Sequence, residues 1–132
     1  MSRAATPAVL RVMFDSNAYD AILAHGDAQR LRALADAGRI EIVTTHVQED
    51  ELRQIADPQR RETLLGLFRD LGGRRVDPAE AIAEDTTHMT RDRMLRLTAR
   101  ACRCLLVTDD RALAATGAGV TDYAGFAARL PR

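Results

Sequence analysis

VLRVMFDSN, residues 9–17, joins an apolar run to a short polar turn. The run Val9–Phe14 is typical of a strand buried in a parallel sheet, and a helical pattern follows from Ala18 to Ala35. In open α/β sheets, ligands bind just outside the carboxyl ends of the strands. We therefore expect Asp15 at the edge of a sheet beside a helix start, where it either caps that helix or belongs to a binding site.

Strand and helix patterns alternate along the rest of the chain. Strands are expected at 40–44, at 105–108 and, as a brief edge strand, at Val120, whereas 74–76 is too short to assign. Helices are expected over 47–56, 58–71, about 90–103 and 112–116, with a turn or two in 78–84 and a final helix that carries Tyr123, Phe126 and Leu130. This order predicts one α/β domain over 1–132, with 1–8 as a loose leader. Its architecture would be a three-layer α/β/α fold with a mostly parallel sheet of four to five short strands.

Composition limits the classes of protein to consider. The 132 residues are 46% hydrophobic and 29% charged, with a net charge of zero, so nothing in the global charge indicates nucleic-acid binding. No apolar run approaches the roughly 20 residues that span a bilayer, so we expect no membrane association and a cytoplasmic location. Cys102 and Cys104 are expected to be reduced thiols that pack, because no further cysteine completes a zinc site.

Acidic residues follow several of the predicted elements. Asp15 ends the first strand, Asp109-Asp110 end the strand at 105–108, Glu49-Asp50-Glu51 lie on the helix after 40–44, and Asp92 opens another helix. If these elements lie side by side, their carboxylates converge and repel one another. A hard divalent cation relieves that repulsion, and carboxylate sites suit Mg²⁺ or Mn²⁺, which can activate water for attack on phosphorus.

Four short motifs on these elements resemble those of the PIN-domain family, small metal-dependent nucleases that include ribonuclease toxins of bacterial toxin–antitoxin pairs. The resemblance runs from about Val9 to Leu130. Its motifs are Phe14-Asp15-Ser16-Asn17; Thr45 six residues before Glu51-Leu52; Asp92 at the start of a helix; and Leu106-Val107-Thr108-Asp109-Asp110. Each motif alone is weak, but four in order on matching elements are fairly specific.

The resemblance implies a PIN-like fold, RNA phosphodiester hydrolysis and a role for particular residues. Asp15, Glu51, Asp92 and Asp110 would be catalytic, and Asp15, Asp92 and Asp110 would hold Mg²⁺ or Mn²⁺. Asn17, Thr108 and Asp109 would support them, and Arg91 and Arg93 at the rim could meet phosphates of the RNA substrate. An antitoxin protein as partner and a homodimer are also implied by the family.

Competing interpretations stay open at several of these positions. Asp110 could instead cap the helix that follows it, Asp92 could merely complement a helix dipole, and Glu49 or Asp50 competes with Glu51. Ala112 stands where many members of the family carry a further acid. A degenerate PIN scaffold that binds RNA or a protein without cutting is therefore the main alternative. A phosphatase of another α/β fold is a weaker one, because Asn17 occupies the second acidic position of its Asp-x-Asp start.

Overall fold

The structure is a computed structural model that describes residues 9–114, 117 and 119–131. Within these residues the strands are β1 (Leu10–Phe14), β2 (Ile40–Thr44), β3 (Arg74–Arg75), β4 (Leu105–Val107) and β5 (Val120–Thr121). The helices are α1 (Ser16–His25), α2 (Ala28–Asp36), α3 (His46–Arg53), α4 (Pro58–Leu71), α5 (Pro78–Ile82), α6 (Arg91–Ala101), α7 (Arg111–Ala114) and α8 (Tyr123–Ala128). The expected leader at 1–8 and the end of the helix expected at 112–116 lie outside the described residues.

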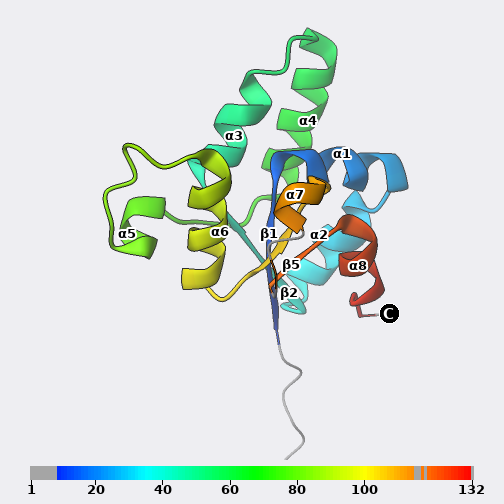
Figure 1. Cartoon of the computed structure of the whole chain (residues 1–132). Helices are drawn as coiled ribbons and strands as arrows, with labels where there is room; N and C mark the ends of the chain where they lie inside the picture. The colour runs from blue at the N-terminus through cyan, green and yellow to red at the C-terminus, as the bar shows by residue number, and fades with distance from the viewer. Residues whose placement is uncertain (1–8, 115–116, 118, 132) are drawn as a thin grey trace, which may run out of the picture.

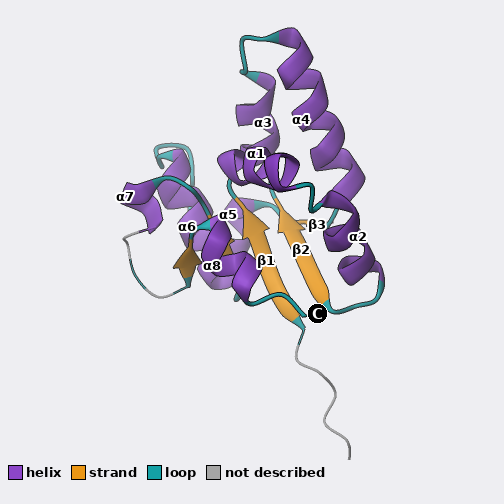
Figure 2. Ribbon diagram, turned by 90° about the vertical axis from the view of Figure 1, so that its right-hand side faces the viewer, coloured by secondary structure: helices purple, strands orange, loops and turns teal. Residues whose placement is uncertain are grey.

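All five strands form one parallel sheet in the order β3-β2-β1-β4-β5. Successive side chains of a strand point to opposite faces of the sheet, and two apolar clusters result. Val12 and Phe14 of β1 pack with α1, α2, α4 and α8, whereas Met13 packs with α3, α6 and α7. Helices thus cover both faces (Figures 1 and 2), and the predicted three-layer α/β/α fold is confirmed.

The carboxyl ends of β1, β2 and β4 meet at one edge of the sheet, where α1 and α3 begin. Figure 2 shows α1 crossing above the ends of β1 and β2, with α3 and α4 standing beyond them. In the register, Phe14 lies beside Val107, the last residue of β4, so Asp15 and Thr108 follow their strands at the same level. Figure 1 shows α6 and α8 on opposite sides of the strands.

Several predicted boundaries shift by a few residues. The helix predicted at 47–56 ends at Arg53, because Gln54 is its C-cap and the next helix already begins at Pro58. The strand predicted at 105–108 ends at Val107, which leaves Thr108 in the loop, and 74–76 contains a two-residue strand. Cys102 is the C-cap residue of α6, so the helix predicted at about 90–103 ends near its expected position, and both cysteines are free thiols.

Candidate functional site at the carboxyl edge of the sheet

Asp15 lies at the centre of this edge, between β1 and α1. It is the N-cap residue of α1 and only 5% exposed. Its Oδ1 accepts the backbone N–H of Ser16 at 2.8 Å, and its Oδ2 accepts the hydroxyl of Thr108, also at 2.8 Å. The two oxygens therefore connect β1 to the loop after β4. A residue that only caps a helix would make the first of these contacts and not the second.

The surroundings of Asp15 disfavour the ionised form of its carboxyl group. Burial raises the pKa of its carboxyl group above the usual 3.8, and the hydrogen bonds from Thr108 and Ser16 offset only part of that rise. The negative charges of Glu51 and Asp92 raise the pKa further. Carboxylates from α3 and α6 therefore act on the carboxylate that ends β1, although these three residues are far apart in the sequence.

Thr108 and Asn17 hold the loop after β4 against α1. The Thr108 hydroxyl is fully buried; it donates to Asp15 and accepts the backbone N–H of Asp110 at 3.1 Å. The side-chain oxygen of Asn17 accepts the backbone N–H of Asp109 at 3.0 Å. These contacts give Asn17 and Thr108 positioning roles, since both orient the backbone beside Asp15.

Asp109 and Asp110 each accept hydrogen bonds from backbone N–H groups at the start of a helix. Oδ1 of Asp110 accepts the backbone N–H groups of Ala112 and Leu113, at 2.9 and 3.2 Å, so it caps α7 as the capping interpretation expected. Oδ1 of Asp109 accepts the N–H of Tyr123 at 3.1 Å, the first residue of α8. For Asp110, Oδ2 remains as the oxygen with which a cation could be held.

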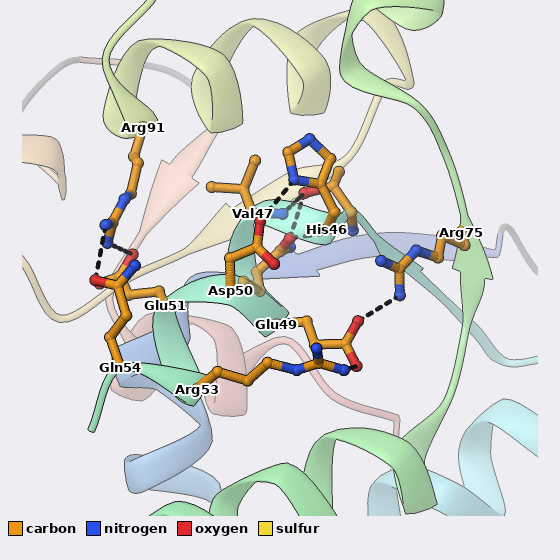
Figure 3. A network of polar contacts seen from close by, with 11 residues as sticks. His46, Val47, Glu49, Asp50, Glu51, Arg53, Gln54, Arg75 and Arg91 are labelled. Atoms are coloured by element: carbon orange, nitrogen blue, oxygen red, sulfur yellow. Dashed lines mark hydrogen bonds and ion pairs between the residues drawn. The ribbon is translucent and has the colours of Figure 1, made fainter. Parts of the chain in front are cut away.

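The three acids of α3 have different partners (Figure 3). Glu49 accepts from Arg53 at 3.1 Å and from Arg75 of β3 at 2.9 Å, and these contacts, Arg75 first, lower its pKa. Oδ2 of Asp50 lies 3.0 Å from Nδ1 of His46. Glu49 and Asp50 are thus paired away from Asp15.

Glu51 differs from Glu49 and Asp50 in its partner and in the pocket that it lines. Its carboxylate lies 3.4 Å from the guanidinium of Arg91, which also donates to Gln54 at 3.0 Å. Glu51 is the acid of α3 that lines a pocket of about 220 Å³, together with Ser16, Asn17, Asp20, Leu52, Ile55 and Arg60. The pocket lies against the start of α1, so it is the space in which a ligand could approach the Asp15 edge.

Two residues of this pocket carry charges that the sequence reasoning did not select. Arg60 of α4 donates to Asp20 of α1 at 2.7 Å. Asp20 had a detectable signal, because it lies one helical turn after Ser16 and shares its face of the helix. Arg60 had none, since only the packing of α4 beside α1 brings it to the pocket.

Asp92 and the two arginines of the rim complete the set of predicted residues. Asp92 is exposed in the first turn of α6, and its charge reaches Asp15. Arg91 is paired with Glu51, whereas the guanidinium of Arg93 has no hydrogen bond or ion pair among the described residues. Of the two arginines predicted at the rim, Arg93 is thus the one whose guanidinium is unpaired within the described residues.

The predicted ligands are carboxylates, which suit a hard cation, but few of them lie close together. Within the described residues, no three His, Cys, Asp or Glu side chains are grouped so as to hold one metal ion. Mg²⁺, however, commonly keeps several waters and uses only one or two protein carboxylates. Buried Asp15, whose ionised form is disfavoured by burial and by two further acids, has the electrostatics that such a cation would relieve.

Comparisons with known proteins do not assign the chain to a group. No protein-family model matches it, and a search of curated proteins also finds no match. None of the helices in the described residues has the length and hydropathy of a bilayer-spanning segment. A functional proposal therefore rests on the geometry of the site and on the motifs.

Proposed function

We propose that this protein is a Mg²⁺- or Mn²⁺-dependent ribonuclease of the PIN-domain type, which hydrolyses RNA phosphodiester bonds. The observation that carries the proposal is the electrostatic state of Asp15. Its carboxylate is buried where a parallel sheet ends, and the acids Glu51 and Asp92 disfavour its ionised form. Burial of the carboxylate, to which the repulsion adds, lowers the stability of the fold, and cation binding is the function that best explains why it is retained.

Each residue of the site would have a distinct task. Asp15, with Asp92 and Oδ2 of Asp110, would hold the cation, which supplies an activated water and stabilises charge on phosphorus. Thr108 fixes Oδ2 of Asp15 by its hydroxyl, and Asn17 fixes the loop that presents Asp110. Glu51 lines the pocket and would accept a proton from the attacking water at its carboxylate.

Arg91 and Arg93 would bind the negatively charged phosphates of the substrate. The guanidinium of Arg93 has no hydrogen bond or ion pair among the described residues, and its fork of N–H donors suits a phosphate. Arg91 would have to exchange Glu51 for a phosphate, and this exchange would free Glu51 for its role as a base. Substrate binding and activation of Glu51 would then be linked.

One group of observations favours a second function, a PIN scaffold that binds RNA or protein without cutting. Asp110 caps α7, Glu51 is paired with Arg91, and Ala112 supplies no further acid. A chain that had lost catalysis would retain these structural contacts and lose only the metal. An antitoxin protein as partner and a homodimer are further parts of the proposal, and they depend on the family resemblance alone. A cytoplasmic location is also part of it, as the apolar runs of the sequence suggested.

Cleavage of mixed single-stranded RNAs tests the proposal. We expect cleavage with Mn²⁺ and none with chelator, and we expect Asp15→Asn to lower the rate at least about a hundredfold, because a positioned metal contributes several kcal/mol to the transition state. The matched control is Asp36→Asn, which removes an exposed carboxylate at the end of α2. Equal cleavage by wild type and Asp15→Asn would remove the catalytic proposal; RNA binding without cleavage would favour the scaffold.

A further inference from the structure

A second pocket, of about 320 Å³, lies between α6 and the last two strands, away from Asp15. Its walls are largely aliphatic and include Leu97, Leu106 and Val120. The thiol of Cys104 also lines it, and burial raises the pKa of that thiol to about 12, so this wall stays uncharged at neutral pH. The pocket therefore suits an apolar side chain.

Two arginines border this apolar space. Arg96 and Arg100 lie one turn apart on α6, and both line the pocket. Across the part of the chain that the structure describes, neither guanidinium has a hydrogen bond or an ion pair. This differs from Arg60, Arg75 and Arg91, each of which meets a carboxylate. Two positive charges without a counter-charge complement an anionic ligand.

Within the described residues, no strand pairs with the outer edge of β5, the strand beside the pocket. β5 is the last strand in the sheet order. The carbonyl group of Gly119 accepts the N–H of Leu106 in β4 at 2.8 Å, and that of Thr121 accepts the N–H of Thr108, just after β4, at 2.9 Å. Because successive residues of a strand direct their backbone groups to opposite edges, the N–H and C=O of Val120 face away from the sheet. Val120 thus offers a backbone donor and acceptor next to the pocket.

We propose that this surface binds an extended peptide segment of another protein, in which acidic residues flank an apolar one. The segment would pair with the open edge of β5, place its apolar side chain in the pocket and direct its carboxylates to Arg96 and Arg100. A single-stranded nucleic acid is the weaker fit, because no aromatic side chain lines the pocket and bases bind to such surfaces by stacking. The proposal goes beyond the ribonuclease function and shares no residue with the Asp15 site.

A peptide selection on the full chain tests this surface. Displayed random twelve-residue peptides are selected on the wild-type protein, and the enriched peptides are synthesised and titrated by fluorescence anisotropy. We expect the enriched peptides to combine at least two acidic residues with an apolar one. Arg96→Glu/Arg100→Glu should weaken their binding at least tenfold.

The control variant Arg32→Glu/Arg69→Glu carries the same change in net charge. Arg32 and Arg69 are exposed on α2 and α4, without partners among the described residues, so this variant should change binding less than twofold. Bound peptide should also slow hydrogen exchange of the Val120 amide in the wild-type chain, but not that of Arg75 on the opposite edge strand. This second measurement needs no folded variant.

Results of three kinds would overturn the proposal. One is enrichment of peptides without the acidic-apolar pattern, or no enrichment at all. Another is equal weakening by the two double variants, or an unchanged exchange rate at Val120. The third is a single-stranded RNA of ten nucleotides that binds in place of peptides and loses its affinity on Arg96→Glu/Arg100→Glu, which would identify a nucleic-acid surface instead.

Discussion

The side chain of Asp15 connects two segments that are far apart in the sequence. It is the N-cap residue of α1, and it accepts a hydrogen bond from Thr108, 93 positions along the chain. Burial first, and then the charges of Glu51 and Asp92, raise the pKa of its carboxyl group. Capping alone would stabilise the ionised form, so the raised pKa indicates that burial and the neighbouring acids outweigh it.

Asp15→Asn should therefore stabilise the metal-free protein at neutral pH. Because the folded-state pKa of Asp15 is raised, ionisation costs folding free energy as the pH rises above the usual value of 3.8, and protonation below that value removes the cost. We expect the variant to gain about 1 kcal/mol in the free energy of unfolding at pH 7, in chelator. Urea unfolding at pH 7 and pH 3 should show this gain shrinking toward zero at the lower pH, and an equal difference at both would contradict the burial argument.

Thr108→Val should destabilise the fold and weaken the site together. The substitution keeps the side-chain shape but leaves Oδ2 of Asp15 and the N–H of Asp110 without their partner, which we expect to cost about 1–3 kcal/mol. Thr63→Val is the control, since the Thr63 hydroxyl bonds only to a backbone carbonyl on an exposed helix face. If thermal unfolding shows the same loss of stability in both variants, the Thr108 hydroxyl does not hold Asp15 and the loop after β4 together.

At the scale of an element, α3 shows what residue spacing determines and what it does not. Thr45 forms a capping box with Gln48, so the start of α3 could be predicted from the sequence. The choice among Glu49, Asp50 and Glu51 depended on the register of a resemblance, and the structure directs them to different partners. Glu51 lies about 200° around the helix from Glu49, which explains why one faces the pocket and the other faces β3.

Glu49→Gln and Glu51→Gln should therefore separate stability from activity. Loss of the Glu49 contacts with Arg75 and Arg53 should lower stability by up to about 1 kcal/mol at neutral pH, with RNA cleavage unchanged. The lowered pKa of Glu49 means that this contribution is present above its usual pKa of 4.5 and is lost as the pH falls through the folded-state value.

Glu51→Gln should instead abolish most cleavage with little effect on stability, because its pair with Arg91 is long and partly exposed. Unfolding curves and cleavage rates, measured for both Glu49→Gln and Glu51→Gln, test these two predictions. The reverse pattern, in which Glu49→Gln loses cleavage, would show that the register of the second motif is wrong.

For the whole molecule, the sequence predicted the layers well and the site only in part. Strand and helix order, Gly and Pro boundaries and alternating apolar residues were enough for a parallel α/β/α fold. Contacts between distant segments, such as Arg60 with Asp20 or Arg91 with Glu51, depend on how helices pack, and no local pattern encodes them. The Asp15 neighbourhood was predictable because strand ends share one edge by topology.

The central claim is that Asp15, with acids from other segments, holds a divalent cation. The measurement that tests it most directly is thermal unfolding of wild type and Asp15→Asn, each in chelator and in Mn²⁺. A cation that binds only the folded state at ten times its Kd adds about 1.4 kcal/mol, which corresponds to several degrees in Tm for a chain of this size. We predict this rise in wild type and its near absence in Asp15→Asn, which should melt higher in chelator. The same response to Mn²⁺ in both proteins would contradict the claim.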